Sequence, residues 1–201
     1  SQEIFLSYNQ VQGEITMLTK DHALKILHEN IKNKNLRKHH YAVAAAMRGL
    51  AVHLNQDPDR WEVVGLLHDA DYEQTKDNPE KHTLVLGEIL DREGADPELI
   101  RAIQSHNYEY TGLEPQTLME WSLFSCDDLT GLIVAVALVH PGKLSGLGGE
   151  SVLKKFDSKS FAAGADREKI QRCEGTLDLN LEEFTGIVLE AMREESDLLG
   201  L

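Results

Sequence analysis

Several histidines fall on the apolar faces of segments that have a helical pattern. His39 precedes Val43 by four residues and therefore shares the apolar stripe of its segment. His82 precedes Leu86 by the same spacing, and His106 follows apolar residues by three and by seven positions. Because residues three, four and seven apart lie on one face of a helix, these imidazoles are expected to point toward the protein interior.

Aspartates occupy comparable positions. His68 and Asp69 end a segment that is apolar on most sides, and Asp127 and Asp128 both follow Phe124 at about one helical turn. Helical spacing alone allows either Asp127 or Asp128 to face inward. An unpaired carboxylate is expensive to bury, so an inward-facing aspartate indicates a cationic partner.

A shared cation would satisfy all of these groups together. Taken singly, an inward histidine is usually an ordinary core residue, but five segments each direct an imidazole or a carboxylate toward the core. Imidazole and carboxylate ligands without cysteine suit Fe, Mn, Zn, Ni or Co rather than a structural zinc–thiolate site. The predicted metal ligands are His39, His68, Asp69, His82, His106 and one of the two adjacent aspartates.

The elements that must position these side chains are all predicted to be helical. Residues 19–201 are expected to form one all-α domain with a C-terminal helical extension, preceded by an N-terminal arm at residues 1–18. Residues 1–16 fit the helical pattern poorly, and Met17 is a candidate natural start. Helices are expected to begin at Thr19, near Leu36, at Asp57-Pro58, Asn78-Pro79, Asp96-Pro97 and Glu114-Pro115, with a loop at 109–115 and a last helix near Leu181–Leu199.

Composition limits the class of protein. The 201 residues include 20 Lys and Arg against 34 Asp and Glu, which gives a net charge of −14 and argues against general nucleic-acid binding. Two cysteines make no disulfide framework and favour a reducing cytosol. No apolar run is expected to reach the roughly 18–20 residues of a membrane span. These features predict a cytoplasmic protein without a membrane partner, and they leave its oligomeric state open.

Four short motifs resemble one known family. Residues 65–72 read G-L-L-H-D-A-D-Y and resemble the G-L-L-H-D-I-D-Y form of the HD-domain metal-dependent phosphohydrolase superfamily. Residues 79–82 and 105–107 are similar to the two further histidine motifs of its HDIG-type, dinuclear branch. Residues 127–131 read D-D-L-T-G and resemble its D-E-L-T-G segment, which selects Asp127 over Asp128. The resemblance covers about residues 20–190, and its small departures, at Ala70 and at Ser125-Cys126, remove no ligand.

The resemblance implies a fold, a metal site and a reaction. The fold would be an HD-domain helical bundle in which His39, His68, Asp69 and Asp127 hold one metal ion. His82 and His106 would hold a second divalent ion, with Asp69 bridging the pair. Two such ions activate a water and clamp a phosphoryl group. The expected activity is therefore metal-dependent phosphohydrolysis of a small phosphate ester or nucleotide, as a phosphomonoesterase or phosphodiesterase.

Residues beside the predicted ligands have more than one interpretation. Asp71 is a candidate catalytic residue together with Asp69, either orienting a ligand or accepting a proton, although a helix-end cap explains it equally well. Lys38 and Lys81 adjoin predicted ligands and are candidate substrate-binding residues, with a solvated surface lysine as the alternative. His40 is interpreted as a wall or packing residue.

Two other functions are compatible with the same ligands. Some enzymes of this family hold iron with this ligand set and act as di-iron oxygenases, and dependence on O₂ would identify one. A non-catalytic ligand-sensing module is the other alternative, and it is disfavoured because no predicted ligand is missing.

Overall fold

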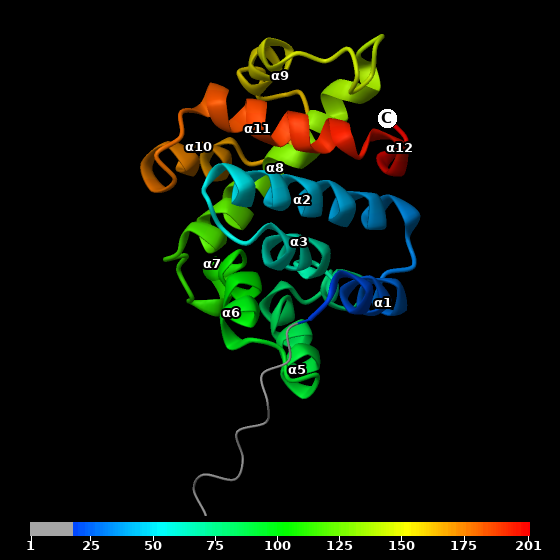
Figure 1. Ribbon diagram of the computed structural model, residues 1–201, viewed down its shortest axis with the longest axis vertical. Helices are drawn as coiled ribbons and strands as arrows, with labels where there is room; N and C mark the ends of the chain where they lie inside the picture. Colours follow the sequence, from blue (N-terminus) through cyan, green and yellow to red (C-terminus); the bar gives the residue numbers. More distant parts are fainter. Residues whose placement is uncertain (1–17) are drawn as a thin grey trace, which may run out of the picture.

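The computed structural model describes residues 18–201. The predicted arm at residues 1–18, apart from Leu18, and the candidate start at Met17 lie outside the described residues. The described part is helical and contains no β-strand, which confirms the all-α prediction (Figure 1). In chain order the elements are α1 (Lys20–Asn30), α2 (Lys34–His53), α3 (Pro58–Leu67), α4 (Tyr72–Thr75), the 3₁₀ turn η1 (Pro79–Lys81), α5 (Leu84–Arg92), α6 (Pro97–Ser105), α7 (Tyr108–Thr111), α8 (Leu118–Val139), α9 (Gly149–Phe156), α10 (Arg167–Thr176), α11 (Leu181–Glu194) and α12 (Ser196–Leu199).

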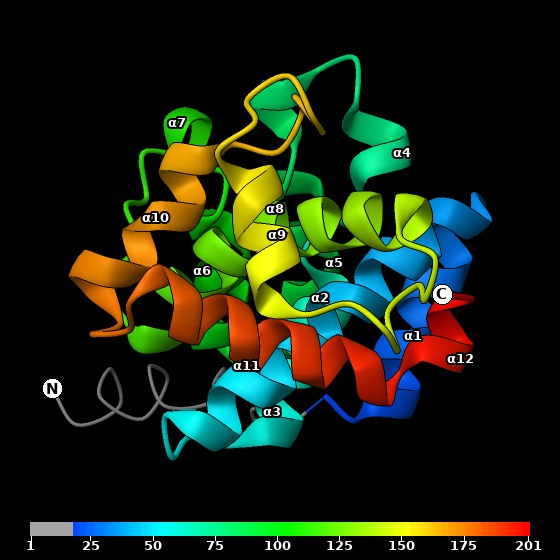
Figure 2. The ribbon, with the colours of Figure 1, turned by 90° about the horizontal axis from the view of Figure 1, so that it is seen from above.

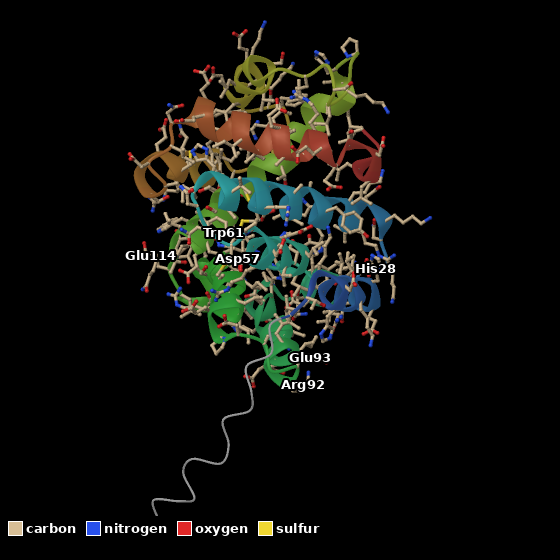
Figure 3. The ribbon with its side chains drawn as sticks, viewed as in Figure 1. His28, Asp57, Trp61, Arg92, Glu93 and Glu114 are labelled. Atoms are coloured by element: carbon tan, nitrogen blue, oxygen red, sulfur yellow. The ribbon has the colours of Figure 1, made fainter. Side chains whose placement is uncertain are left out.

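Side-chain caps fix several helix starts where the sequence indicated them. Thr19 caps α1 by accepting the His22 N–H. Asp57, which is labelled in Figure 3, caps α3 with Pro58 in the first turn. Asp96 caps α6 in the same way. These starts are confirmed because each depends on residues that are adjacent in the sequence.

Three local predictions were wrong. The helix expected to begin at Glu114-Pro115 begins at Leu118, because Thr117 and Glu120 form a capping box there. The one-turn helix α7 extends to Thr111, into the loop expected at 109–115. The single helix expected to begin at Asn78-Pro79 is broken into η1 and α5.

The break before α5 has a tertiary cause. Thr83 adopts a left-handed conformation with φ of 68°, and α5 starts at the next residue. The buried carboxylate of Asp71 accepts the Leu86 N–H at 3.0 Å, in the first turn of α5. A residue twelve positions before Thr83 therefore supplies the hydrogen bond that a local cap would otherwise provide.

Helix α2 occupies the middle of the molecule. It lies between α1 and α3 on one side and α8, α11 and α12 on the other (Figure 1). Seen from above, α9, α10 and α11 form a layer over α8 and α2 (Figure 2). One continuous cluster of buried apolar side chains runs through these helices, from Leu18 to Leu199.

Helix α8 is a core helix as well as the carrier of Asp127. Within residues 18–201 it is the one helix whose length and apolar composition would suffice to cross a membrane, with a mean hydropathy of 1.8. The expectation that no apolar stretch reaches that length is therefore wrong. Buried core helices pass the same test, and 61% of the α8 window is buried by the rest of the protein.

A glycine allows α2 and α3 to approach closely. A Cβ atom at Gly65 would lie 2.6 Å from Ala44 Cα and 2.8 Å from Ala44 N. The His40 ring also joins these helices, since its Nδ1 lies 2.9 Å from the Leu66 carbonyl oxygen. His40 is buried and packs between the two helices, and burial lowers its pKa to about 3.

We expect Gly65→Ala to lower the free energy of unfolding by about 3 kcal/mol, because the new methyl group collides with backbone that cannot rotate away. Denaturant unfolding measures the change. Gly175→Ala is the matched control, since a Cβ at Gly175 in α10 has open space and should stabilise the helix by about 0.5–1 kcal/mol. Equal stability of the Gly65→Ala and wild-type proteins would contradict the close packing of α2 on α3.

Candidate metal centre

Four of the predicted ligands meet where α2, the end of α3 and α8 come together. His39 lies on α2, His68 and Asp69 directly follow α3, and Asp127 lies on α8. His39 Nε2 is 2.9 Å from Asp127 Oδ1. His68 Nε2 is 3.6 Å from the same oxygen and 3.7 Å from Asp69 Oδ2. His39, His68 and Asp69 form one group with the spacing of a metal site, and Asp127 lies beside both of its histidines.

The other two predicted ligands meet on the opposite side of Asp69. His82 Nε2 lies 3.0 Å and His106 Nε2 lies 3.1 Å from Asp69 Oδ1. Asp69, His82 and His106 form a second group with metal-site spacing. One oxygen of Asp69 thus faces each group, which is the arrangement that a bridging carboxylate requires.

Backbone hydrogen bonds orient two of the histidines beside Asp69. His68 Nδ1 lies 2.8 Å from the Gly65 carbonyl oxygen, and His106 Nδ1 lies 2.6 Å from that of Ile103. These carbonyls accept hydrogen bonds from Nδ1–H, which leaves Nε2 of each ring directed toward the cluster. Metal-binding histidines are held in the same way by a partner at the far ring nitrogen.

The donor set fits a bound cation. His68 is fully buried, and its Nε2 has no hydrogen-bond partner among residues 18–201. An orphaned buried nitrogen beside two carboxylates is costly unless something positive binds there. Imidazole nitrogens and carboxylate oxygens without thiolates suit a divalent transition-metal ion.

Charges within the cluster shift its pKa values strongly. Burial disfavours the charged form of His68, but the carboxylates of Asp69 and Asp127 outweigh burial and raise its pKa to about 9. Burial also disfavours the charged form of His82, but the carboxylates of Asp69 and Asp71 outweigh it and raise the pKa of His82 to about 10. Burial opposes ionisation of Asp69, yet His68, His106 and His82 hold its pKa well below the usual value. A metal ion must therefore displace protons from the imidazoles, so that binding releases protons.

Asp71 is completely buried and faces His82 rather than the centre of the cluster. Its Oδ1 lies 2.8 Å from His82 Nδ1, and its Oδ2 accepts the Leu86 N–H. It makes no side-chain capping bond to α4, which starts at the next residue. This geometry is that of a positioning residue, because both carboxylate oxygens are engaged away from the place where a substrate would bind.

The two lysines lie at the edge of the centre. Lys81 is exposed on η1, one residue before His82. Lys38 lines a cavity together with His39, and a Cβ at Gly200 would lie 2.6 Å from its Nζ atom. The Lys38 ammonium therefore packs against the C-terminal turn that follows α12.

A loop of the C-terminal extension lines the metal centre, and no pattern in the sequence indicates this contact. Ala162, Gly164 and Ala165 share a small pocket of about 370 Å³ with His39, Asp69, Asp127 and Asp128. The Arg167 guanidinium holds this loop by donating to the carbonyl oxygens of Phe161, Ala162 and Ala165 at 2.6–2.7 Å. Helical periodicity cannot reveal such a contact, because the loop has none.

Asp128 anchors the same loop from α8. Its Oδ1 accepts the Asp166 N–H at 2.9 Å. Burial, and then the neighbouring charge of Asp127, raise the pKa of Asp128 to about 6. The two adjacent aspartates thus differ in surroundings: Asp127 faces two imidazoles, which hold its pKa far below the usual value, and Asp128 faces the loop.

Metal should stabilise the fold, because the ligands converge only in the folded chain. An ion present at a hundred times its Kd would add about 2.7 kcal/mol, which corresponds to a rise in Tm of about 5–10 °C. Calorimetry with and without a chelator measures the shift. An unchanged Tm in a protein shown to have lost its metal would contradict the assignment.

Comparison with known families adds one finding. The family model for the HD domain matches residues 36–137, which is half of the chain and includes all six predicted ligands. No curated protein and no solved structure matches the chain. The loop at residues 162–165 lies beyond the matched region.

Proposed function

The chain belongs to the HD-domain family, and from that premise we propose that it is a dinuclear metal-dependent phosphohydrolase acting on a small phosphate ester or nucleotide. The observation that carries the proposal is the position of Asp69, with Oδ2 facing the group of His39 and His68 and Oδ1 facing His82 and His106. A carboxylate between two histidine groups is suited to hold two divalent ions of the Fe, Mn, Ni, Co or Zn class.

Some of these residues would bind the ions, and others would orient the residues that bind them. His39, His68, Asp69 and Asp127 would hold one ion, and His82, His106 and Asp69 the other. When bound, the ions would supply a water of lowered pKa and neutralise charge on a phosphoryl group. Asp71 would hold the His82 ring in position, and the loop at 162–165 would restrict the water around the site.

The protein's own charge makes this local positive site necessary. A chain of net charge −14 repels phosphate esters, whereas a pair of divalent ions attracts them. We also propose a reducing, cytoplasmic setting without a membrane or nucleic-acid partner. The free, buried thiols of Cys126 and Cys173 and the net negative charge support this proposal.

Metal analysis followed by a substrate screen tests the proposed activity. Purified protein would be assayed against phosphomonoesters and phosphodiesters with Mn²⁺, Co²⁺, Ni²⁺ or Mg²⁺, each with and without O₂. We expect release of phosphate or a nucleoside monophosphate under anaerobic conditions with Mn²⁺ or Mg²⁺. Turnover that requires iron and O₂ would instead identify an oxygenase, and metal binding without turnover of any ester would favour the sensing module.

Lys81 is the proposed contact to the substrate phosphate. Because it lies beside His82 and outside the ligand groups, Lys81→Ala should raise KM severalfold and change kcat little. Steady-state kinetics on the best substrate of the screen gives both constants. Lys76→Ala, at an exposed lysine nearby, is the matched control. A fall in kcat with unchanged KM would contradict a binding role for Lys81.

A further inference from the structure

A second cavity adjoins the metal centre along α2 and α8. It measures about 500 Å³. Most of its lining is apolar, from Val134, Leu138, Leu199 and Leu201, and Asn35, Lys38 and His39 are its polar side chains. Leu138 is 69% exposed, so the cavity opens onto an apolar part of the surface. Exposed apolar surface around a hollow is a common sign of a ligand site.

The cavity adjoins the pocket over the metal ligands. His39 and Gly131 line both. Gly131 follows Asp127 by four residues on α8, and Val134 follows Asp127 by seven, so the same helix face passes from the metal centre into the cavity. Another cavity of the described chain, of about 910 Å³, has none of the six predicted ligands in its lining.

Gly131 leaves the junction between the two hollows open. A Cβ atom placed there would meet nothing within 4 Å. Gly131 lies inside a long helix, where glycine is less favourable than alanine by about 1 kcal/mol. Gly131 is exposed at the edge that the two hollows share, so a larger side chain there would occupy space beside both.

We propose that this cavity binds the organic group of the substrate, and that this group is compact and largely apolar. The inference rests on the proposed phosphohydrolase function and names its substrate class. Hydrolysis adds water across the phosphorus–oxygen bond of the ester, so that the alcohol leaves from this cavity and inorganic phosphate leaves from the metal centre. Gly131 is then the residue that sets how large an organic group can enter.

Binding of n-alkyl phosphonates tests the inference without turnover, because their carbon–phosphorus bond is not an ester. Calorimetry on the metal-loaded protein would give Kd for methyl, ethyl, propyl and butyl phosphonate. We expect Kd to fall about fourfold for each added methylene, because this is the gain in affinity when one methylene moves from water into an apolar cavity. The kcat/KM of the corresponding alkyl phosphates should rise in parallel.

Gly131→Ala and Gly131→Leu place side chains of increasing size at the position that both hollows share. The dependence of Kd on chain length should weaken in the alanine variant and vanish in the leucine variant, which fills the junction. Gly175→Leu is the matched control, because Gly175 is also a helix glycine with open space around it, and it should keep the wild-type dependence. Far-UV circular dichroism verifies that each variant is folded.

The outcomes separate this inference from the proposed function. If alkyl phosphates are hydrolysed but neither series depends on chain length, the cavity does not bind the organic group and the inference is wrong. The same conclusion follows if folded Gly131→Leu keeps the wild-type dependence. If phosphonate binding is graded but no ester is hydrolysed, the ligand class of the cavity stands and the hydrolytic function is wrong.

Discussion

Asp69→Ala should lose both metal ions and abolish turnover while remaining folded. Asp69 is the one predicted ligand whose carboxylate faces both histidine groups, at 3.0–3.1 Å from His82 and His106 through Oδ1 and 3.7 Å from His68 through Oδ2. Its removal also takes away a carboxylate that lies within 4 Å of all three imidazoles. Metal content and rate at matched circular dichroism measure the result.

The asparagine variant separates shape from charge at the same position. Asp69→Asn keeps the side-chain volume but loses the negative charge and one good oxygen donor, so its activity should fail almost as completely. Asp77→Ala, at an exposed aspartate in the segment that leads to η1, is the control and should keep both metal and activity. A folded Asp69→Ala protein with wild-type activity would overturn the proposed site.

His82→Ala should remove one ion and keep the other. His82 belongs to the group of Asp69 and His106, whereas His39 and His68 belong to the other group. We expect the metal content to fall by half and kcat by at least about a hundredfold, since one of two charge-stabilising centres is lost. Elemental analysis beside steady-state kinetics measures both. Loss of both ions, or of neither, would contradict two groups joined at Asp69.

Asp71→Asn refines the same prediction. The amide still accepts the Leu86 N–H, but it no longer provides a carboxylate for His82 Nδ1. Partners of metal-bound histidines typically contribute about 10–100-fold in affinity or activity. The variant should therefore lie between wild type and His82→Ala in metal affinity, with the wild-type number of ions at saturating metal.

Local chemistry made much of the fold predictable from the sequence. Thr19, Asp57 and Asp96 cap helices with neighbouring N–H groups, so that their positions needed no tertiary information. The inward histidines could be found for the same reason, because the apolar stripe of a helix identifies its buried face. Helical periodicity could not distinguish Asp127 from Asp128, because both fit one helical face. The resemblance of residues 127–131 to the family's D-E-L-T-G segment selected Asp127.

Contacts between distant segments were not predictable in the same way. The helix break at Thr83 depends on the Asp71 carboxylate, which reaches Leu86 only after the chain has folded back. The loop at 162–165 enters the metal centre because Arg167 and Asp128 hold it there. Arg167 belongs to no recognised motif, and the D-D-L-T-G motif that contains Asp128 gives no indication of its contact with the loop. The cavity beside Gly131 is likewise a property of the packing of α2, α8 and the turn after α12.

The metal-to-protein ratio of wild type, His82→Ala and Asp69→Ala, measured by elemental analysis after reconstitution and removal of free metal, tests the central claim most directly. A carboxylate shared by two ions predicts two ions per chain in the wild type, one in His82→Ala and none in Asp69→Ala. A folded Asp69→Ala protein that retains the wild-type ratio would contradict the shared site.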